Sequence, residues 1–338
     1  MKVAFRADAS VQIGAGHVMR CLTLADKLLE RGARTRFLCR PSPGHLGDLI
    51  LARGHALDWL PDAMPDAAAS SQALAVGAPH DWLVVDHYAL GADWERAQRG
   101  LVESILAIDD LADRMHDCDV LLDQNLQTGH RYDGLLPADC RVLLGPSYAL
   151  LRPEFQRARV AIAPGLDSVG NILVCFGGSD PLDLTGLTLD ALDRLERFDL
   201  LVEVVVGQAY PYCDRLKARC ATRPGTHFHC QADDLAGLMA RADLAIGASG
   251  VVTWERACVG LPALAITFAD NQRPIAAAAQ AAGMLTWVGD AGAVSAERLA
   301  EAIVALLDAP AQRKAMRQAC LEMVDGAGCG RVVEALSG

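Results

Sequence analysis

Residues 3–20 read VAFRADASVQIGAGHVMR, and this stretch decides the fold class. Its first five residues, Val3–Ala7, form an apolar run typical of a buried strand, and the GAG segment that follows is typical of a turn. An apolar stripe at helical spacing then continues as far as Arg31. A strand that leads through a glycine turn into a helix is the unit from which parallel sheets are built, so the sequence predicts an α/β fold.

The same pattern repeats along the chain and predicts two doubly wound domains. We expect an N-terminal Rossmann-like domain over residues 1–155 and a C-terminal one over residues 165–338, with a linker between Phe155 and Gly170. Further strands are predicted at 35–39, 56–60, 82–86, 104–109, 120–122, 142–145, 200–207, 226–230, 243–249 and 263–267, and residues 171–178 read as a strand that ends in a turn. Helices are predicted at 45–53 and 184–195, and a tail of two or three helices runs from about 297 to 336 with a break at Pro310. Whether this tail returns to the first domain stays open.

Composition excludes several classes of function. The chain has 338 residues, 52% hydrophobic and 22% charged, as in a well-folded globular protein. Its net charge of −11 argues against nucleic acid as a partner, although a small phosphorylated ligand could still bind at helix N-termini. No apolar stretch is long enough to span a membrane, and the N-terminus reads as a strand rather than a signal peptide. We therefore expect a cytoplasmic protein, and its oligomeric state stays open.

Eleven cysteines are scattered without a C-x-x-C pair, which favours free buried thiols. The one cluster that could suggest a metal comprises Cys213, Cys220, His227, His229 and Cys230. The histidines alternate along a predicted strand, but the spacings match no common zinc pattern. We predict neither a metal nor a cofactor.

His17 is the first candidate for chemistry, because it follows Gly14 and Gly16 at the start of a predicted helix. The positive end of the helix dipole disfavours the imidazolium, and a neutral imidazole can accept a proton as a general base. A histidine that merely caps the helix would have the same spacing. The glycines do not complete a G-x-G-x-x-G motif, since position 19 is Met19, and this weakens a dinucleotide-binding interpretation.

Loops after predicted strands of the second half could hold an anion. Paired glycines let the backbone approach a phosphate closely, although an ordinary strand-to-helix turn would look the same. Glu255 lies about one and a half turns into the helix predicted after the second of these loops. Its carboxylate could reach a diol there, although a position on a solvated helix face would look the same. The candidate residues of these loops are Gly177, Gly178, Ser179, Ser249, Gly250, Thr253, Glu255, Asn271 and Gln272.

Polar residues also follow two strands of the first half, at the same predicted sheet edge. Tyr88, in the segment Asp86–Tyr88, could bind a sugar or contact the surroundings of His17. Asp109 and Asp110 could serve acid–base or metal chemistry, but Asp is frequent at strand ends for reasons of turn geometry, which we favour here.

Four motifs together resemble one known family. FRADAS-x-x-I-GAGHVMR, VVDHY, GPSYALLRPEF (145–155) and FGGSD (176–180) are similar to motifs of the UDP-2,4-diacetamido-2,4,6-trideoxy-altropyranose hydrolases of pseudaminic-acid biosynthesis. The similarity covers roughly residues 1–290. The second half also resembles GT-B glycosyltransferases, which have two Rossmann-like domains facing a central cleft.

The resemblance implies metal-independent hydrolysis of a UDP-sugar at its anomeric carbon, with inversion. The family's G-x-G-H-x-x-R motif is intact as Gly14, Gly16, His17 and Arg20, which implies that His17, at the mouth of the cleft, is the catalytic histidine. The resemblance further places phosphate at residues 177–179, ribose at Glu255, and phosphate or sugar near Asn271 and Gln272. We list His17 and Tyr88 as catalytic, and Gly14, Gly16 and Arg20 with the second-half loops as substrate-binding.

One base suffices for this chemistry, because a nucleoside diphosphate leaves as a stabilised anion and needs little help from an acid. Two alternatives remain: a GT-B glycosyltransferase that passes the sugar to an acceptor alcohol, and a non-catalytic subunit that binds nucleotide-sugars.

Overall fold

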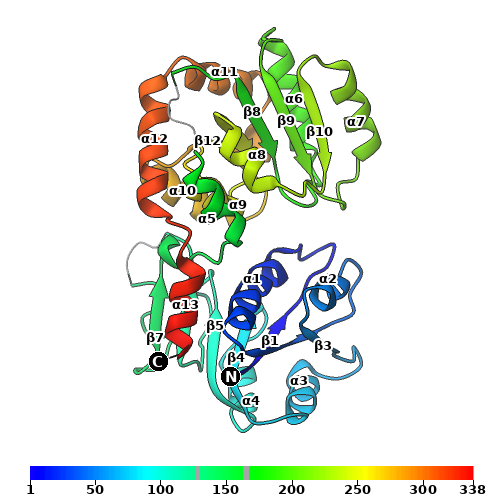
Figure 1. Cartoon of the computed structure of the whole chain (residues 1–338), viewed down its shortest axis with the longest axis vertical. Helices are drawn as coiled ribbons and strands as arrows, with labels where there is room; N and C mark the ends of the chain where they lie inside the picture. Colours follow the sequence, from blue (N-terminus) through cyan, green and yellow to red (C-terminus); the bar gives the residue numbers. More distant parts are fainter. Residues whose placement is uncertain (127–129, 163–166, 338) are drawn as a thin grey trace. The chain divides into compact units, whose positions relative to one another are not determined.

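The computed structural model describes residues 1–126, 130–162 and 167–337. The chain divides into two compact units (Figure 1): unit 1 comprises Met1–Leu151 and Ala327–Gly338, and unit 2 comprises Arg152–Gly326. Each unit contains its own parallel sheet. The prediction of two doubly wound domains is therefore confirmed.

The sheet of unit 1 has seven parallel strands in the order β3-β2-β1-β4-β5-β6-β7. The order reverses direction between β1 and β4, so that loops following these two strands lie side by side at the carboxyl edge, where open α/β sheets bind ligands. The strands are β1 (Lys2–Ala7), β2 (Arg34–Cys39), β3 (Ala56–Trp59), β4 (His80–Asp86), β5 (Val102–Ile108), β6 (Val120–Asp123) and β7 (Arg141–Leu144).

Helices cover both faces of this sheet, because alternate strand residues point to opposite sides. Phe5 of β1 shares a buried cluster with side chains of α1 (Gly16–Glu30), α2 (Gly47–Ala52) and α13 (Gly328–Ser337). Its neighbour Ala4 belongs to a second cluster with α3 (Asp66–Ala75) and α4 (Ala92–Gln98). A short 3-10 helix, η1 (Pro146–Tyr148), ends the strand region.

The last helix, α13, belongs to unit 1, whereas the predicted bounds of the C-terminal domain, 165–338, included it and left its return to the first domain open. Val332, Val333 and Leu336 of this helix are buried in the cluster that contains α1. The indole nitrogen of Trp82 donates to the carbonyl of Leu336 at 3.0 Å. An amphipathic helix settles where its apolar stripe finds the largest apolar surface, and that surface is here far away in sequence.

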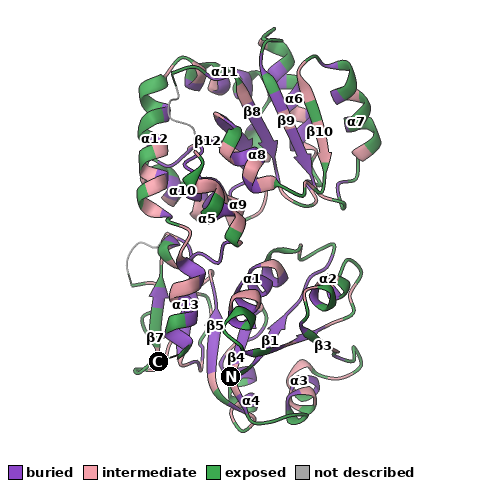
Figure 2. Ribbon diagram, viewed as in Figure 1, coloured by how far each residue is buried: buried purple, intermediate pink, exposed green. Residues whose placement is uncertain are grey.

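Unit 2 repeats the doubly wound pattern with six parallel strands in the order β10-β9-β8-β11-β12-β13. Its reversal point lies between β8 and β11. Figure 2 shows β8 and β9 as largely buried strands, in keeping with a sheet covered on both faces. The strands are β8 (Asn171–Cys175), β9 (Leu201–Val206), β10 (Thr226–Cys230), β11 (Leu244–Gly247), β12 (Ala263–Thr267) and β13 (Thr286–Asp290).

The helices of unit 2 mostly follow the predicted segments. Pro310 begins α12, as its lack of an N–H group favours, and so separates α12 from α11. Strand β13 and helix α5 were not predicted; α5 occupies part of the expected linker, and residues 163–166 of that linker lie outside the described residues. The helices are α5 (Pro153–Val160), α6 (Leu184–Arg194), α7 (Cys213–Thr222), α8 (Leu235–Arg241), α9 (Val252–Cys258), α10 (Gln272–Ala281), α11 (Ala296–Leu307) and α12 (Pro310–Met323), with a 3-10 turn η2 at Ala291–Ala293.

Candidate functional site

His17 and Asp86 form a buried hydrogen-bonded pair at the reversal point of the first sheet. His17 is the second residue of α1, which follows β1, and Asp86 is the last residue of β4. The imidazole Nδ1 lies 2.6 Å from Asp86 Oδ1, and the two residues are 8% and 1% exposed. Sequence spacing left open whether His17 merely caps its helix. In the structure the His17 side chain bonds to a carboxylate, and α1 has no side-chain cap.

Arg20 fixes the Asp86 carboxylate from the next turn of α1. Its Nε donates to Oδ2 at 2.5 Å and its Nη2 donates to Oδ1 at 2.7 Å, a two-pronged contact that matches the carboxylate plane. Burial alone would raise the pKa of Asp86, but the charge of Arg20 and the contact with His17 outweigh it and hold this pKa well below its usual range. Asp86 is therefore an anion.

An ionised Asp86 determines which nitrogen of His17 carries the proton. A carboxylate only accepts hydrogen bonds, so the hydrogen of neutral His17 sits on Nδ1 and the lone pair on Nε2. Within residues 1–126, 130–162 and 167–337, no hydrogen bond to Nε2 is formed. The same geometry, with a carboxylate on Nδ1 and a lone pair on Nε2, occurs in other enzymes where an acid orients a histidine base.

Tyr88 lies beside His17, as the sequence suggested, with ring centroids 4.6 Å apart and the rings edge to face. Arg20, for which substrate binding stays a prediction, lies inside the unit. It is 4% exposed, and besides Asp86 it contacts Asp110 Oδ2 at 3.3 Å. Its position is that of a residue that supports the His17–Asp86 pair from inside the unit.

The backbone conformation requires glycine at position 14, whereas neither backbone nor packing requires it at position 16. Gly14 has φ +82°, a conformation that favours glycine, and its N–H donates to Ser10 O at 2.8 Å to close the turn before α1. At Gly16 a side-chain Cβ would meet no atom within 4 Å. The packing of the unit does not require glycine there, so the surface over the first turn of α1 is open.

Asp109 belongs to a second buried cluster, at the end of β5, with His116 and Glu95. His116 Nδ1 lies 2.7 Å from Glu95 Oε1, and Nε2 lies 3.8 Å from Asp109 Oδ2. Burial alone lowers the pKa of His116, but the two carboxylates outweigh it and raise the pKa to about 9. These contacts are internal, which agrees with the structural interpretation of Asp109.

This cluster should make the stability of unit 1 depend on pH. Since the folded pKa of His116 exceeds the unfolded value of about 6.5, its contribution is complete below pH 6.5 and is lost as pH rises through about 9. At about 1.4 kcal/mol per pH unit, this corresponds to roughly 3 kcal/mol between those limits. Urea unfolding of the native chain and of His116→Gln across this range measures it, with His80→Gln as a control. Equal slopes for the native chain and His116→Gln would contradict the assignment.

The predicted loops of unit 2 flank the reversal point between β8 and β11. Gly177, two residues after the end of β8, has φ +98°. Ser249 follows β11, and its hydroxyl lies 3.4 Å from that of Thr253, with both residues buried. The FGGSD loop is held by its own Asp180, whose carboxylate accepts from the backbone N–H groups of Leu184 and Thr185 at 2.9 and 2.8 Å. Gly178 and Ser179 lie within this held loop, and Gly250 follows Ser249.

Glu255 is a partly buried carboxylate in α9, and its Oε1 lies 3.3 Å from Arg152 Nη2. Gln272 is used within its own loop, because its Oε1 accepts from the N–H of Phe268 at 3.1 Å. Asn271 is exposed at the N-terminus of α10 and provides no side-chain cap.

Neither the cysteines nor the histidines of β10 gather into a metal site in the described part of the chain. His227 and His229 both contact Glu203, at 3.2 and 2.6 Å. All eleven cysteines are free thiols.

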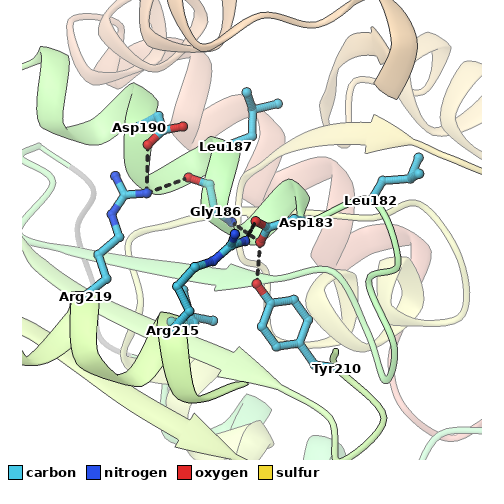
Figure 3. A pocket seen from close by; sticks show the side chains of 9 residues that line it. Leu182, Asp183, Gly186, Leu187, Asp190, Tyr210, Arg215 and Arg219 are labelled. Carbon is cyan, nitrogen blue, oxygen red and sulfur yellow. Dashed lines mark hydrogen bonds and ion pairs between the residues drawn. The ribbon is translucent and has the colours of Figure 1, made fainter. Parts of the chain in front are cut away.

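A pocket of about 480 Å³ lies elsewhere in unit 2, between α6 and α7 (Figure 3). Its polar groups are paired with one another: Asp183 bonds to Tyr210 and Arg215, and Arg219 contacts Asp190 at 2.7 Å. None of the predicted site residues lines it.

The sequence alone predicted no role for Asp86 or Arg152. Both stood in motifs that we quoted, VVDHY and GPSYALLRPEF, but their partners lie 69 and 103 residues away. A strand-final Asp in a motif was the only signal available for Asp86.

In the described parts of the chain, no helix is both long and apolar enough to cross a lipid bilayer.

Comparison with solved structures establishes the fold as GT-B. MurG of Acinetobacter baumannii superimposes with a TM-score of 0.70 at 16% identity, over 99% of both chains. UDP-GlcNAc 2-epimerase of Neisseria meningitidis, solved with UDP-GlcNAc bound, gives 0.65 at 13% identity, over the whole of both chains. At these identities the likeness defines the fold alone.

Two curated relatives are more informative. The chain is 28% identical over 82% of its length to the UDP-2,4-diacetamido-2,4,6-trideoxy-β-L-altropyranose hydrolase of Campylobacter jejuni, covering 95% of that protein. It is 27% identical over 99% of its length to the spore coat polysaccharide biosynthesis protein SpsG of Bacillus subtilis, covering 98% of it. No protein-family model matches the chain. The resemblance to the altropyranose hydrolases is confirmed, and the named hydrolase relative acts on a UDP-sugar.

Proposed function

We propose that this protein hydrolyses a UDP-linked 2,4-diacetamido-2,4,6-trideoxy sugar at the anomeric carbon, releasing UDP and the free sugar with inversion, in the biosynthesis of pseudaminic or a related nonulosonic acid. The observation that supports this most is the His17–Asp86 pair, held by Arg20. It provides a single oriented base, which is what displacement of a good leaving group by water requires.

In the proposed reaction, His17 Nε2 accepts a proton from a water molecule while the oxygen of that water attacks C1 of the sugar. The bond between C1 and the phosphate oxygen breaks, and its electron pair leaves with UDP. Asp86 stabilises the imidazolium that forms, because it accepts the hydrogen bond from Nδ1. Attack by water from the face opposite to UDP inverts the configuration at C1.

UDP leaves as an anion, so donors must hold its charge. We assign this role to the loops after β8 and β11, at Gly177–Ser179 and Ser249–Gly250, because ligands of doubly wound sheets bind at the reversal point. Each donor aimed at developing charge contributes about 3–4 kcal/mol in other enzymes. Glu255 would accept hydrogen bonds from the ribose hydroxyls. No step needs a metal ion.

The decisive experiment incubates the chain with candidate UDP-diacetamido sugars in ¹⁸O-water without an acceptor. We expect UDP that contains no ¹⁸O by ³¹P NMR, because water attacks carbon rather than phosphorus, and proton NMR should show the inverted anomer first. Release of UDP only after an acceptor alcohol is added would identify a glycosyltransferase instead, as many GT-B proteins are. Tight binding of UDP without any turnover would identify a binding subunit.

A further inference from the structure

Arg152 is a charged residue that the proposed reaction leaves without a role. It precedes the first turn of α5, in the motif GPSYALLRPEF. Its guanidinium lies 3.3 Å from Glu255 Oε1, 2.9 Å from Glu154 Oε1 and 5.0 Å from the centre of the Phe155 ring. With a side chain only 22% exposed, Arg152 is directed at a carboxylate 103 residues away in the chain.

Glu255 needs such a partner because its side chain is only 15% exposed. Burial raises the pKa of Glu255, the charge and hydrogen bond of Arg152 lower it, and the like charge of Glu154 raises it, so that the pKa stays above its usual value. Arg256 is the other nearby cation, but its Nη2 donates away from Glu255, to Ala248 O at 2.8 Å. Among the described residues, the thiols of Cys175 and Cys258 also interact electrostatically with Glu255.

We propose that Arg152 is a positioning residue of the nucleotide site, which keeps Glu255 ionised and oriented to accept both ribose hydroxyls of UDP. This rests on the proposed function, in which Glu255 binds the ribose. The contact uses one lone pair of Oε1, and among the described residues no other hydrogen bond to this carboxylate is formed, so Oε2 and the second lone pair of Oε1 can each accept from a hydroxyl. A carboxylate accepts from two hydroxyls at once, whereas a protonated acid loses acceptor capacity. Glu154 competes for the same guanidinium and so weakens this effect.

The test is calorimetric titration of the full chain with UDP between about pH 6 and pH 8.5. For Arg152→Met we expect about tenfold weaker binding near pH 6, because Glu255 becomes protonated and a charged hydrogen bond is lost. Binding should recover toward pH 8.5, where the acid ionises without help. Arg152→Lys should bind nearly as the native chain does. Glu154→Gln, a matched variant of the same cluster, should shift binding the opposite way and remain strong at lower pH.

Further arms separate this role from others. Glu255→Gln should bind UDP weakly at every pH, and adding Arg152→Met to it should cost little more, since the two residues act as one unit. For 2′-deoxy-UDP the penalty of Arg152→Met should be smaller. If UDP binding by Arg152→Met recovers at high pH, the role of Arg152 is electrostatic, because a variant that had lost its structure would bind UDP weakly at every pH.

The outcomes are distinct. If the native chain does not bind UDP, the proposed nucleotide site itself is wrong. If the native chain binds UDP and Arg152→Met binds it equally at every pH, the role of Arg152 is wrong while the nucleotide site stands. A loss that is independent of pH and persists in the Glu255→Gln background would mean that Arg152 contacts the nucleotide directly, and would also overturn the proposal.

Discussion

Replacing His17 by Asn should reduce kcat for UDP release by about 10²- to 10⁴-fold, the range typical of losing a general base. Asn has no ring nitrogen that could accept a proton from water, yet it is polar and fits within the volume of His. Because the nucleotide is proposed to be held by loops of unit 2, the affinity for UDP should change little. Steady-state kinetics and a UDP titration on the same preparation measure both quantities.

His80→Asn is the matched control for this substitution. His80 is buried at the opposite end of β4, where its Nε2 contacts the carbonyl of Leu74 at 3.1 Å. Both substitutions remove a buried imidazole, but only His17 lies at the carboxyl edge of the sheet. Turnover by His17→Asn at the native rate would exclude His17 as the base and with it the proposed mechanism.

Replacing Asp86 by Asn should have the second large effect, with kcat falling on the order of 10³-fold. The exchange removes the charge that stabilises an imidazolium on His17, and it leaves the buried charge of Arg20 3.3 Å from Nδ1. The same exchange in a serine protease triad costs roughly 10⁴-fold. Whichever way the Asn amide is turned, its NH₂ group meets a donor of Arg20, because Arg20 contacts both oxygens of Asp86.

The same variant should also unfold more easily, because breaking a buried ion pair costs about 3–5 kcal/mol when the remaining charge is uncompensated. The contact of Arg20 with Asp110 should reduce that cost. The double variant Arg20→Gln, Asp86→Asn removes both charges, so we expect it to recover part of the stability but none of the activity. Urea unfolding and steady-state kinetics of the three variants separate the two effects. Native kcat in a folded Asp86→Asn variant would disprove the orienting role.

The sequence placed His17 and Tyr88 at one sheet edge, because both follow strongly apolar strands, and the structure has their rings side by side. The catalytic roles of the two residues stay predictions. The sequence did not assign Asp86 a role, since an aspartate at a strand end is common for reasons of turn geometry. The substrate-binding role of Arg20 stays a prediction, and spacing could not show that this side chain neutralises a buried acid, because Asp86 lies 66 residues away in the chain.

The amino-acid pattern by itself determined the α/β class, nearly every strand, and the two-domain organisation, since each of these depends on periodicity and turns among neighbouring residues. Only the tertiary structure decided the order of the strands, the return of α13 to unit 1 and the pairs His17–Asp86 and Arg152–Glu255. The physical reason is that many strand orders bury the same apolar residues equally well. Contacts between residues far apart in sequence are fixed only when one order brings their charges and apolar surfaces together.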